Sequence, residues 1–479
     1  MFDYRTFALR KLVGIAPRYL PFADVATEDV PLSRLLRLSL FQVTVGMALV
    51  LLVGTLNRVM IVELAVPASL VAGMLALPLI FAPFRTLIGF KSDTHVSALG
   101  WKRVPYIWKG TLYQFGGFAV MPFALLVLSG YAEAIDAPRW IGLSAAAIAF
   151  LLVGAGVHIV QTAGLALATD LVKEEDHPKV VGLMYVMLLI GMVVSALAYG
   201  ALLENYTPGR LIQVIQGTAV VSALLNIFAM WKQEARDRDR AVAMSRAPRQ
   251  RFSEAWSGLV ARPGVLRLLM MIGLGTFGFG MADVLLEPYG GQALGLSVAD
   301  TTKLTALLAG GTLVGFAIAS RVLGGGGHPE RLGSIGAAVG IPGFVAIILS
   351  SSTMGAPLFI FGTFATGLGA GLFGHATLTA TIRSAPSHQT GLALGAWGAV
   401  QATCAGIGVA IAGAVRDLLL ESGAFGGLQA HAPYNVVFMI EIAFLALAVI
   451  IAIPVFAGRS PARSDTVAGI SESESVEVP

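Results

Sequence analysis

The sequence predicts an all-α integral membrane protein with twelve transmembrane helices in two pseudo-symmetric six-helix halves. Its mean hydropathy is +0.78, and 56% of its residues are hydrophobic while only 13% are charged. Soluble proteins carry about twice that share of charge. The apolar runs reach the ~20 residues that a spanning helix needs, and they lack the alternation that marks the strands of a membrane barrel.

Two apolar runs end alike, and this similarity indicates the two halves. The first run carries Asn57, Arg58 and Glu63 at its end, and the second carries Asp283 and Glu287 at the corresponding place. The runs start roughly 230 residues apart in a chain of 479 residues, as two homologous halves would. Charge within a spanning segment is costly and is kept where it is used, so these five residues are candidate functional residues.

The predicted spans follow one another along the chain. They lie near residues 38–60, 67–88, 106–130, 140–168, 180–203, 210–231, 265–287, 301–321, 333–351, 356–381, 388–415 and 434–457. On this map about 27 of the 32 Lys and Arg residues fall on the side of the two termini, which the positive-inside rule places in the cytoplasm. Membrane topology therefore explains the net positive charge, and no nucleic-acid partner is predicted.

The spans divide the chain into five parts. These are an interfacial N-terminal segment (1–35), a six-helix bundle (36–231), a charged linker (232–264), a second six-helix bundle (265–457) and a cytoplasmic tail (458–479). The linker is either a solvated connection held near anionic headgroups or a docking site for a cytoplasmic partner. The acidic tail lacks apolar periodicity and is predicted to be disordered.

The seventh span is expected to end at Glu287, because the next residue is Pro288 and a proline restricts the residue before it. Arg58, Glu63, Asp283 and Glu287 would then form an ion-pair cluster that closes the extracytoplasmic ends of the first and seventh helices, near the interface where water lowers the cost of charge. The alternative is proton coupling, with Asp283 or Glu287 titrating as the interior opens.

Six plus six helices with a long central connection resemble the major facilitator superfamily. Between its second and third helices that superfamily carries a motif of Gly, three further residues and Asp, followed by basic residues. Gly89 and Asp93, followed by Lys102 and Arg103, resemble this motif. The resemblance implies a cytoplasmic gate in which the aspartate meets a helix N-terminus or a basic group and holds one conformation closed. The corresponding place in the second half ends in Ala319, so the gate is not expected to be symmetric.

The same resemblance implies that helices 1, 4, 7 and 10 line the interior, and these helices carry no Arg or Lys at mid-depth. A carrier of charged solutes would need one, so the ligand is expected to be lipophilic. His158 and His375 lie at comparable mid-membrane depth. Each imidazole is expected to bind the magnesium of a chlorin, to relay protons, or only to form a hydrogen bond with a neighbouring helix. The glycines of helices 10 and 11 suit close packing, or a flat groove in which Phe373 and Trp397 stack on a planar ligand.

The residues show no nucleotide-binding loop, metalloprotease helix or nucleophile elbow. Neither an enzyme nor a metal site built from protein side chains is predicted.

Three long strings carry a more specific resemblance. Residues 36–95, 101–123 and 283–295 are similar to the light-harvesting-complex assembly proteins of purple photosynthetic bacteria, the PucC and LhaA proteins. These form the bacteriochlorophyll delivery branch of the major facilitator superfamily. The similarity extends from residue 17 to about residue 458 and leaves out the variable ends.

The resemblance implies an assembly factor in the bacterial inner (photosynthetic intracytoplasmic) membrane that aids insertion of antenna polypeptides and binds or hands over bacteriochlorophyll. Expected partners are the antenna polypeptides, the reaction centre–core antenna complex, the pigment-synthesis or insertion machinery and the lipid membrane. The length and the N-terminal strings favour the LhaA type, which serves the core antenna, over the peripheral PucC type. A proton-coupled transporter of a small lipophilic solute and a purely structural scaffold beside the antenna ring are the alternatives.

Overall fold

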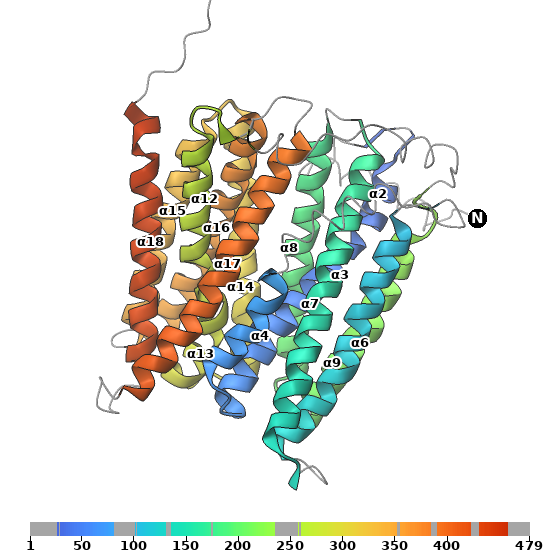
Figure 1. Ribbon diagram of the computed structural model, residues 1–479, viewed down its shortest axis with the longest axis vertical. Helices are drawn as coiled ribbons and strands as arrows, with labels where there is room; N and C mark the ends of the chain where they lie inside the picture. Colours follow the sequence, from blue (N-terminus) through green and yellow to red (C-terminus); the bar gives the residue numbers. More distant parts are fainter. Residues whose placement is uncertain are drawn as a thin grey trace, which may run out of the picture.

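The computed structural model describes residues 26–27, 29–80, 101, 103–130, 136–173, 176–234, 257, 260–351, 355–384, 390–422 and 431–457. Every regular element within these ranges is a helix. Figure 1 shows the helices as two bundles standing side by side, one built from α2 to α9 and the other from α12 to α18.

The first bundle contains the helical segments predicted between residues 36 and 231. Its first span is one helical run that changes from α to π geometry near Val50. The parts of this run are α2 (Leu32–Leu38), α3 (Leu40–Leu49), η2 (Val50–Leu56) and η3 (Val59–Glu63). The other helices are α4 (Ala68–Ile80), α6 (Val104–Ser129), α7 (Arg139–Asp170), α8 (His177–Leu202) and α9 (Pro208–Met230).

The second bundle repeats this arrangement, and its first span is also divided into two helical segments. These are α12 (Val265–Gly280) and α13 (Ala282–Leu294). They are followed by α14 (Val298–Gly324), α15 (Pro329–Ser350), α16 (Ala356–Ser384), α17 (Thr390–Glu421) and α18 (Ala432–Ala457).

Eleven helices of the described ranges are long and apolar enough to cross a membrane. The shorter apolar helix α4 lies at the place of the second predicted span. The predicted all-α fold, with apolar spans in two bundles, is therefore confirmed. Most of the linker, the end segments and the cytoplasmic position of both termini fall outside the described residues and stay predictions.

The seventh span does not end at Glu287, as the sequence predicts, but continues through Pro288 to Leu294. A proline has no N–H and leaves the carbonyl four positions earlier without its helical donor. That carbonyl belongs to Val284, and it accepts a hydrogen bond of 2.8 Å from Asn57 Nδ2. A side chain of the first bundle thus replaces the missing donor, and the helix passes the proline.

Two helix pairs join the bundles, since α4 packs against α17 and α8 packs against α14. Small residues allow α17 to lie close to α4. A Cβ added at Gly413 of α17 would lie 2.5 Å from the Cβ of Ala72 and 2.7 Å from the carbonyl oxygen of Ala68, both in α4, so only glycine fits there. At Gly200 of α8, a Cβ would lie 3.2 Å from the carbonyl oxygen of Ala299 in α14. Helices that approach this closely bring their polar side chains within bonding distance.

The glycines of α16 serve first in packing within the second bundle. A Cβ at Gly367 would overlap the carbonyl of Leu308 in α14, and a Cβ at Gly371 would overlap the carbonyl of Thr312 one turn later. Only a residue without a side chain permits this contact. At these two positions the close-packing interpretation of the glycines is confirmed.

Candidate functional site

Polar side chains of the two bundles meet near the end of the first span. We call this set the polar seam, and it consists of Thr55, Asn57, Arg58, Glu287, Thr302 and Thr305. The hydroxyl oxygens of Thr55 and Thr302 are 3.1 Å apart. Arg58 Nη2 donates to the carbonyl oxygen of Leu296 at 3.0 Å. Together with the bond from Asn57 to Val284, these contacts tie the π-helical part of the first span to α13 and α14.

Glu287 lies in the middle of the seam and is buried, with an exposed fraction of 4%. Its Oε1 accepts a hydrogen bond from the Thr305 hydroxyl and occupies the space that a side chain at Gly54 would fill. Its Oε2 has no hydrogen-bond partner within the described residues. Because Gly54 has no side chain, a carboxylate of the second bundle reaches the backbone of the first span. π-Helical turns such as those around Gly54 are frequent at functional sites.

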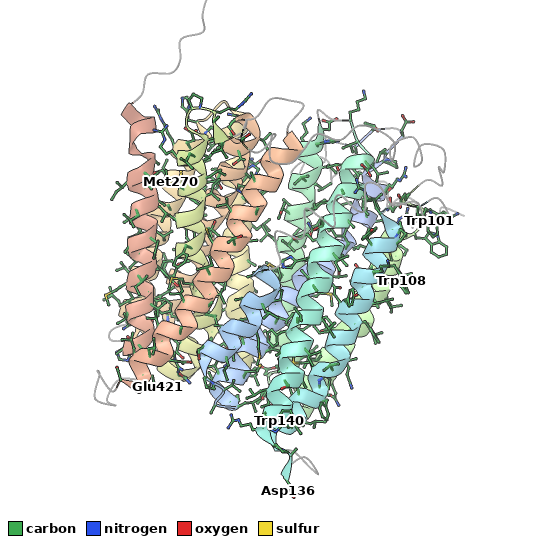
Figure 2. The ribbon with its side chains drawn as sticks, viewed as in Figure 1. Trp101, Trp108, Asp136, Trp140, Met270 and Glu421 are labelled. Atoms are coloured by element: carbon green, nitrogen blue, oxygen red, sulfur yellow. The ribbon has the colours of Figure 1, made fainter. Side chains whose placement is uncertain are left out.

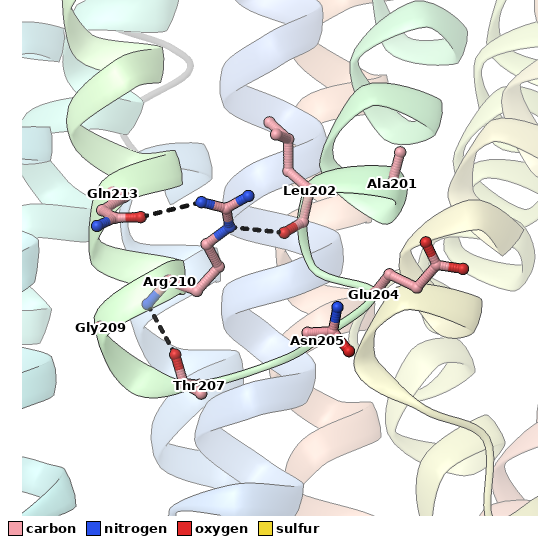
Figure 3. Close-up of a pocket in the computed structure, with 8 residues that line it drawn as sticks. All are labelled: Ala201, Leu202, Glu204, Asn205, Thr207, Gly209, Arg210 and Gln213. Atoms are coloured by element: carbon pink, nitrogen blue, oxygen red, sulfur yellow. Dashed lines mark hydrogen bonds between the residues drawn. The ribbon is translucent and has the colours of Figure 1, made fainter.

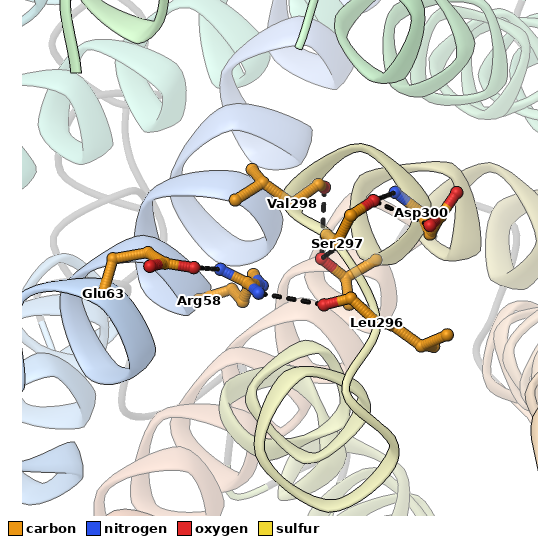
Figure 4. A network of polar contacts seen from close by, with 7 residues as sticks. Arg58, Glu63, Leu296, Ser297, Val298 and Asp300 are labelled. Carbon is orange, nitrogen blue, oxygen red and sulfur yellow. Dashed lines mark hydrogen bonds and ion pairs between the residues drawn. The ribbon is translucent and has the colours of Figure 1, made fainter. Parts of the chain in front are cut away.

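Arg58 forms an ion pair with Glu63, with Nη1 and Oε1 2.5 Å apart. Figure 4 shows the guanidinium between Glu63 and the carbonyl of Leu296, so one side chain links an acid of its own helix to the other bundle. Tyr206, in the connection between α8 and α9, lies near this pair. Burial raises the pKa of Tyr206 to about 12, with Glu63 adding to the rise and Arg58 opposing it.

The structure divides the predicted cluster of charges. Arg58 and Glu63 pair within the first span, and Glu287 lies in the seam. Asp283, one helical turn before Glu287, is exposed and belongs to neither contact. Neither acid of α13 lies at the end of the seventh span, because the helix continues to Leu294.

Sequence reasoning missed a further acid, Glu441 in α18, whose side chain is completely buried. It is the only acidic or basic residue between positions 434 and 457. That isolation was the signal that would have found it, because a lone charge in an apolar span is retained for a purpose.

A second group of side chains joins the bundles nearer to the predicted cytoplasmic side. We call it the ring cluster, and it consists of Tyr185 of α8, Phe316 of α14, His375 of α16 and Trp397 of α17. The ring centroids of Phe316 and His375 are 4.1 Å apart, and those of Tyr185 and Trp397 are 6.5 Å apart in an edge arrangement. Phe316 and Tyr185 belong to one apolar cluster that crosses the bundles. At 1.5 Å per residue, each ring lies ~11–14 Å from the cytoplasmic end of its helix, so the four share one depth.

The ring cluster is mostly buried, and two glycines next to it in the sequence have no atom packed against them. His375 is 8% exposed and Trp397 is 7% exposed. The indole Nε1 of Trp397 donates to the hydroxyl of Thr377 at 3.3 Å, which fixes the ring against α16. A Cβ at Gly374 or at Gly398, next to these residues in the sequence, would meet no atom within 4 Å. Aromatic faces beside unfilled positions suit a planar apolar ring system.

Of the four predicted pigment-binding residues, the structure brings His375 and Trp397 into one cluster. Phe373 lies inside the second bundle, where its ring fills the space left by Gly275 and its centroid is 5.9 Å from that of Phe279. His158 is half-buried in α7 of the first bundle and takes no part in the ring contacts above. Tyr185 and Phe316 were missed, because only packing shows that they meet His375 and Trp397.

The predicted cytoplasmic gate motif falls mostly outside the described residues, which include neither Gly89, Asp93 nor Lys102. Arg103 is described, and its Nε binds Asp170 Oδ2 at 3.0 Å.

Arg103 also donates its backbone N–H to Glu234 at 3.0 Å, and Val104 donates to the same carboxylate at 3.0 Å. The carboxylate therefore caps the N-terminus of α6. Each of these contacts joins helix ends of the first bundle or the residues just after it, so they stabilise the predicted cytoplasmic end of that bundle.

A surface hollow of about 470 Å³ opens at the other end, between α8 and α9 (Figure 3). Arg210 crosses it and donates to the Leu202 carbonyl at 3.1 Å and to Gln213 Oε1 at 3.2 Å. These bonds occupy the guanidinium within the loop, and the hollow touches neither the polar seam nor the ring cluster. Among the described residues, no group of three His, Cys, Asp or Glu side chains could hold a metal ion.

Comparison with known proteins gives close relatives over nearly the whole chain. The model of the family described as PUCC protein matches residues 55–460. The chain is 71% identical over 453 residues to Protein PucC of Rhodobacter capsulatus, which covers 94% of this chain and 98% of that protein. It is 64% identical to Protein PucC of Rhodovulum sulfidophilum, over 86% of this chain and 90% of that protein. A more distant relative, at 27% identity over 91% of this chain and 98% of that protein, is the bacteriochlorophyll synthase 44.5 kDa chain of Rhodobacter capsulatus.

Solved structures with low sequence identity share the fold. A mutant of the nucleoside transporter NupG matches with a TM-score of 0.66 and 13% identity, over 88% of this chain and 100% of that chain. A bacterial homologue of the human lysosomal transporter Spinster matches with a TM-score of 0.64 and 16% identity, over 90% of this chain and 98% of that chain. The fold is therefore that of the major facilitator superfamily.

Proposed function

The chain belongs to the PUCC protein family, and from this membership we propose that it is a non-enzymatic assembly factor for the light-harvesting antenna of a photosynthetic bacterium. It binds antenna polypeptides within the intracytoplasmic membrane and delivers bacteriochlorophyll to them. The name of the relative at 27% identity, a bacteriochlorophyll synthase chain, supports the choice of pigment.

The ring cluster is the observation that carries this proposal. Bacteriochlorophyll is a flat macrocycle with a central magnesium and a hydrocarbon tail. Its faces stack on aromatic rings, and its magnesium accepts an imidazole nitrogen. Trp397 and Tyr185 offer the rings and His375 offers the imidazole, and the glycines that follow or precede two of them in the sequence, Gly398 and Gly374, have no atom packed against them.

The placement of the cluster supports delivery as well as binding. It is built from helices of both bundles, so a relative movement of the bundles changes the space between its rings. A pigment held there would be gripped in one arrangement and released in another, which is how proteins of this fold handle their cargo.

The two relatives above 60% identity carry the name PucC, and their names favour the PucC type over the LhaA type that the sequence analysis preferred. Which antenna the protein serves, the peripheral or the core antenna, belongs to this proposal and follows from the choice between the two types. So are the reaction centre–core antenna complex and the pigment-synthesis or insertion machinery as further partners.

The test is a mild-detergent extraction of the full chain from photosynthetic cells, followed by an absorbance spectrum and identification of bound subunits. The wild type should carry bacteriochlorophyll and antenna polypeptides. Trp397→Leu should retain ~2–12-fold less pigment, since one aromatic contact is worth ~0.5–1.5 kcal/mol. Trp140→Leu is the matched control, because Trp140 is 67% exposed on α7 and should leave retention unchanged. Equal retention by both variants, or a wild type without pigment and antenna polypeptides, would overturn the proposal.

A second function is favoured by Glu287, a buried acid with one unpaired oxygen at the meeting of the two bundles. It is proton-coupled transport of a small lipophilic solute, in which Glu287 exchanges its proton as the seam opens. Liposomes with purified protein should then show pH-dependent uptake that Glu287→Gln abolishes and that needs no antenna polypeptide. Pigment retention that survives Glu287→Gln, without any uptake, would favour the assembly role instead.

A further inference from the structure

Glu441 lies deep in the second bundle with no group to neutralise its charge. The side chain has an exposed fraction of 0%. Both of its carboxylate oxygens are buried and have no hydrogen-bond partner within the described part of the chain. An ionised carboxylate without partners is far more costly in apolar surroundings than the neutral acid. A residue kept in this position must therefore carry a proton or meet a cation.

The helices packed against α18 supply no such cation. These helices are α12, α13, α15 and α17. Their charged residues, apart from the acids of α13, lie near the helix ends and are Arg267, Glu330, Arg331, Arg416, Asp417 and Glu421. Their neutral titratable residues, with that of α18 itself, are Tyr289, Cys404 and Tyr434. The guanidinium of Arg416 is occupied by Asp417 at 2.7 Å and by Gln292 at 2.8 Å.

Among the helices packed against α18, α13 supplies another acid, Asp283. The two lie at one level of the bundle. Glu441 is nine residues from the start of α18 and Asp283 is eleven residues from the end of α13, which corresponds to ~14 Å and ~17 Å from the same side. Two negative charges at this depth would repel each other, so the pair is stable only when a proton is bound.

Asp283 is also less covered by protein than Glu441. It is exposed, while its neighbours in α13 are buried. It stands one helical turn before Glu287, and residues four apart share a helix face. Since Glu287 contacts the first bundle at Gly54, Asp283 is placed on the side of α13 that opens to the space between the bundles.

We propose that Glu441 and Asp283 form a proton-binding site, in which Glu441 holds the proton and Asp283 passes it to and from the space between the bundles. In the loading step the Asp283 carboxylate takes a proton from a hydronium ion, which leaves as water. Its O–H bond then breaks as the O–H bond of Glu441 forms, and Asp283 regains its negative charge. The site does not depend on the proposed role in antenna assembly, and it would serve any movement of the bundles that requires Glu441 to be neutral.

The experiment is infrared spectroscopy of the purified full-length protein in lipid nanodiscs at neutral pH. The carbonyl stretch of a protonated carboxylic acid is separate from the bands of carboxylates. The wild type should show this band, and Glu441→Gln should weaken it. Glu287→Gln measures the share of the other buried acid, Glu287. Glu421→Gln is the matched control, because Glu421 is an exposed acid at the end of α17 and its loss should leave the band unchanged.

The exchange of the acid's proton for deuterium tests the path through Asp283. Asp283→Asn should keep the band and slow its exchange at least several-fold, because the residue that passes the proton is gone. If Glu441→Gln does not fold, this exchange rate in Asp283→Asn decides the question alone. Identical bands in the wild type and Glu441→Gln, or exchange unaffected by Asp283→Asn, would overturn the proposal. If the thermal stability instead rises with sodium concentration at constant pH, the site holds a bound cation and not a proton, and the proposal is wrong.

Discussion

The bond between Asn57 and Val284 offers the sharpest test of how the two bundles are joined. Pro288 leaves the Val284 carbonyl without a helical donor, and Asn57 Nδ2 supplies the replacement at 2.8 Å. Asn57→Ala removes that donor and leaves a buried acceptor unsatisfied, which costs ~1–3 kcal/mol. The Oδ1 of Asn57 has no partner within the described residues, so its removal adds no cost. We expect a loss of ~1–2 kcal/mol, which is ~5–30-fold in the folding equilibrium.

The cost of the unsatisfied Val284 carbonyl can be separated from the cost of the cavity that the truncation of Asn57 leaves. In a Pro288→Ala background, the N–H of residue 288 returns to the helix and satisfies Val284 from within α13. Asn57→Ala should therefore cost less there, with a coupling of ~0.5–3 kcal/mol in the double-mutant cycle. The cavity is the same in both backgrounds and cancels.

The assay is reversible unfolding of the purified protein in mixed micelles, titrated with a denaturing detergent and followed by circular dichroism. Thr55→Val is the matched control, since Thr55 bonds to Thr302 in the same seam without involving Val284. Its cost should be equal with and without Pro288→Ala. If Asn57→Ala were equally costly in both backgrounds, the account of how α13 passes its proline would be wrong.

Three further predictions concern packing, charge and pH. Gly371→Val should destabilise the protein by ~1–3 kcal/mol, because its side chain would overlap a carbonyl of α14; Gly310→Val, at a position with no atom within 4 Å of the new Cβ, should cost much less in the same unfolding assay. Arg416→Gln should cost ~3–5 kcal/mol, because it leaves the buried carboxylate of Asp417 without its ion pair, and adding Asp417→Asn should recover much of that loss. Tyr206 should ionise near pH 12 in the folded protein and near its ordinary value of 10 in the unfolded chain; its contribution to stability is complete below pH 10 and lost as the pH rises to about 12, and Tyr206→Phe should remove both this loss and the corresponding step in tyrosinate absorbance.

The fold was predictable because the solvent imposes it. In lipid every backbone N–H and C=O must be satisfied within the protein, and a helix does this almost entirely within its own segment, so a run of ~20 apolar residues becomes a spanning helix. Local composition therefore predicted the spans, and the repeat of polar residues at Asn57 and Asp283 indicated the two halves. The wrong boundary at Pro288 has a distant cause, since the donor that lets the helix continue comes from Asn57, 231 positions before the proline in the sequence.

The candidate sites were predictable only in part. The sequence singled out His375 and Trp397 by residue type and depth, but their companions Tyr185 and Phe316 are ordinary apolar-face residues until α8, α14, α16 and α17 are packed. The partners of the charges were also beyond the sequence. Matching depth placed Glu287 with Arg58, and the structure brings both into the polar seam, where Glu287 contacts a backbone glycine and a threonine hydroxyl while Arg58 pairs with Glu63.

By itself the sequence determined that this chain spans a membrane as two related helix bundles, because the cost of exposing polar groups to lipid acts on each segment separately. The long strings at residues 36–95, 101–123 and 283–295 also indicated the family, since strings of that length are specific to one family. Only the tertiary structure decided which side chains meet, that Asn57 completes a helix of the other bundle, and that Glu441 lies buried near a second acid. These contacts depend on distances of a few ångströms between helices. Helix packing sets those distances, and they cannot be read from any single segment of the sequence.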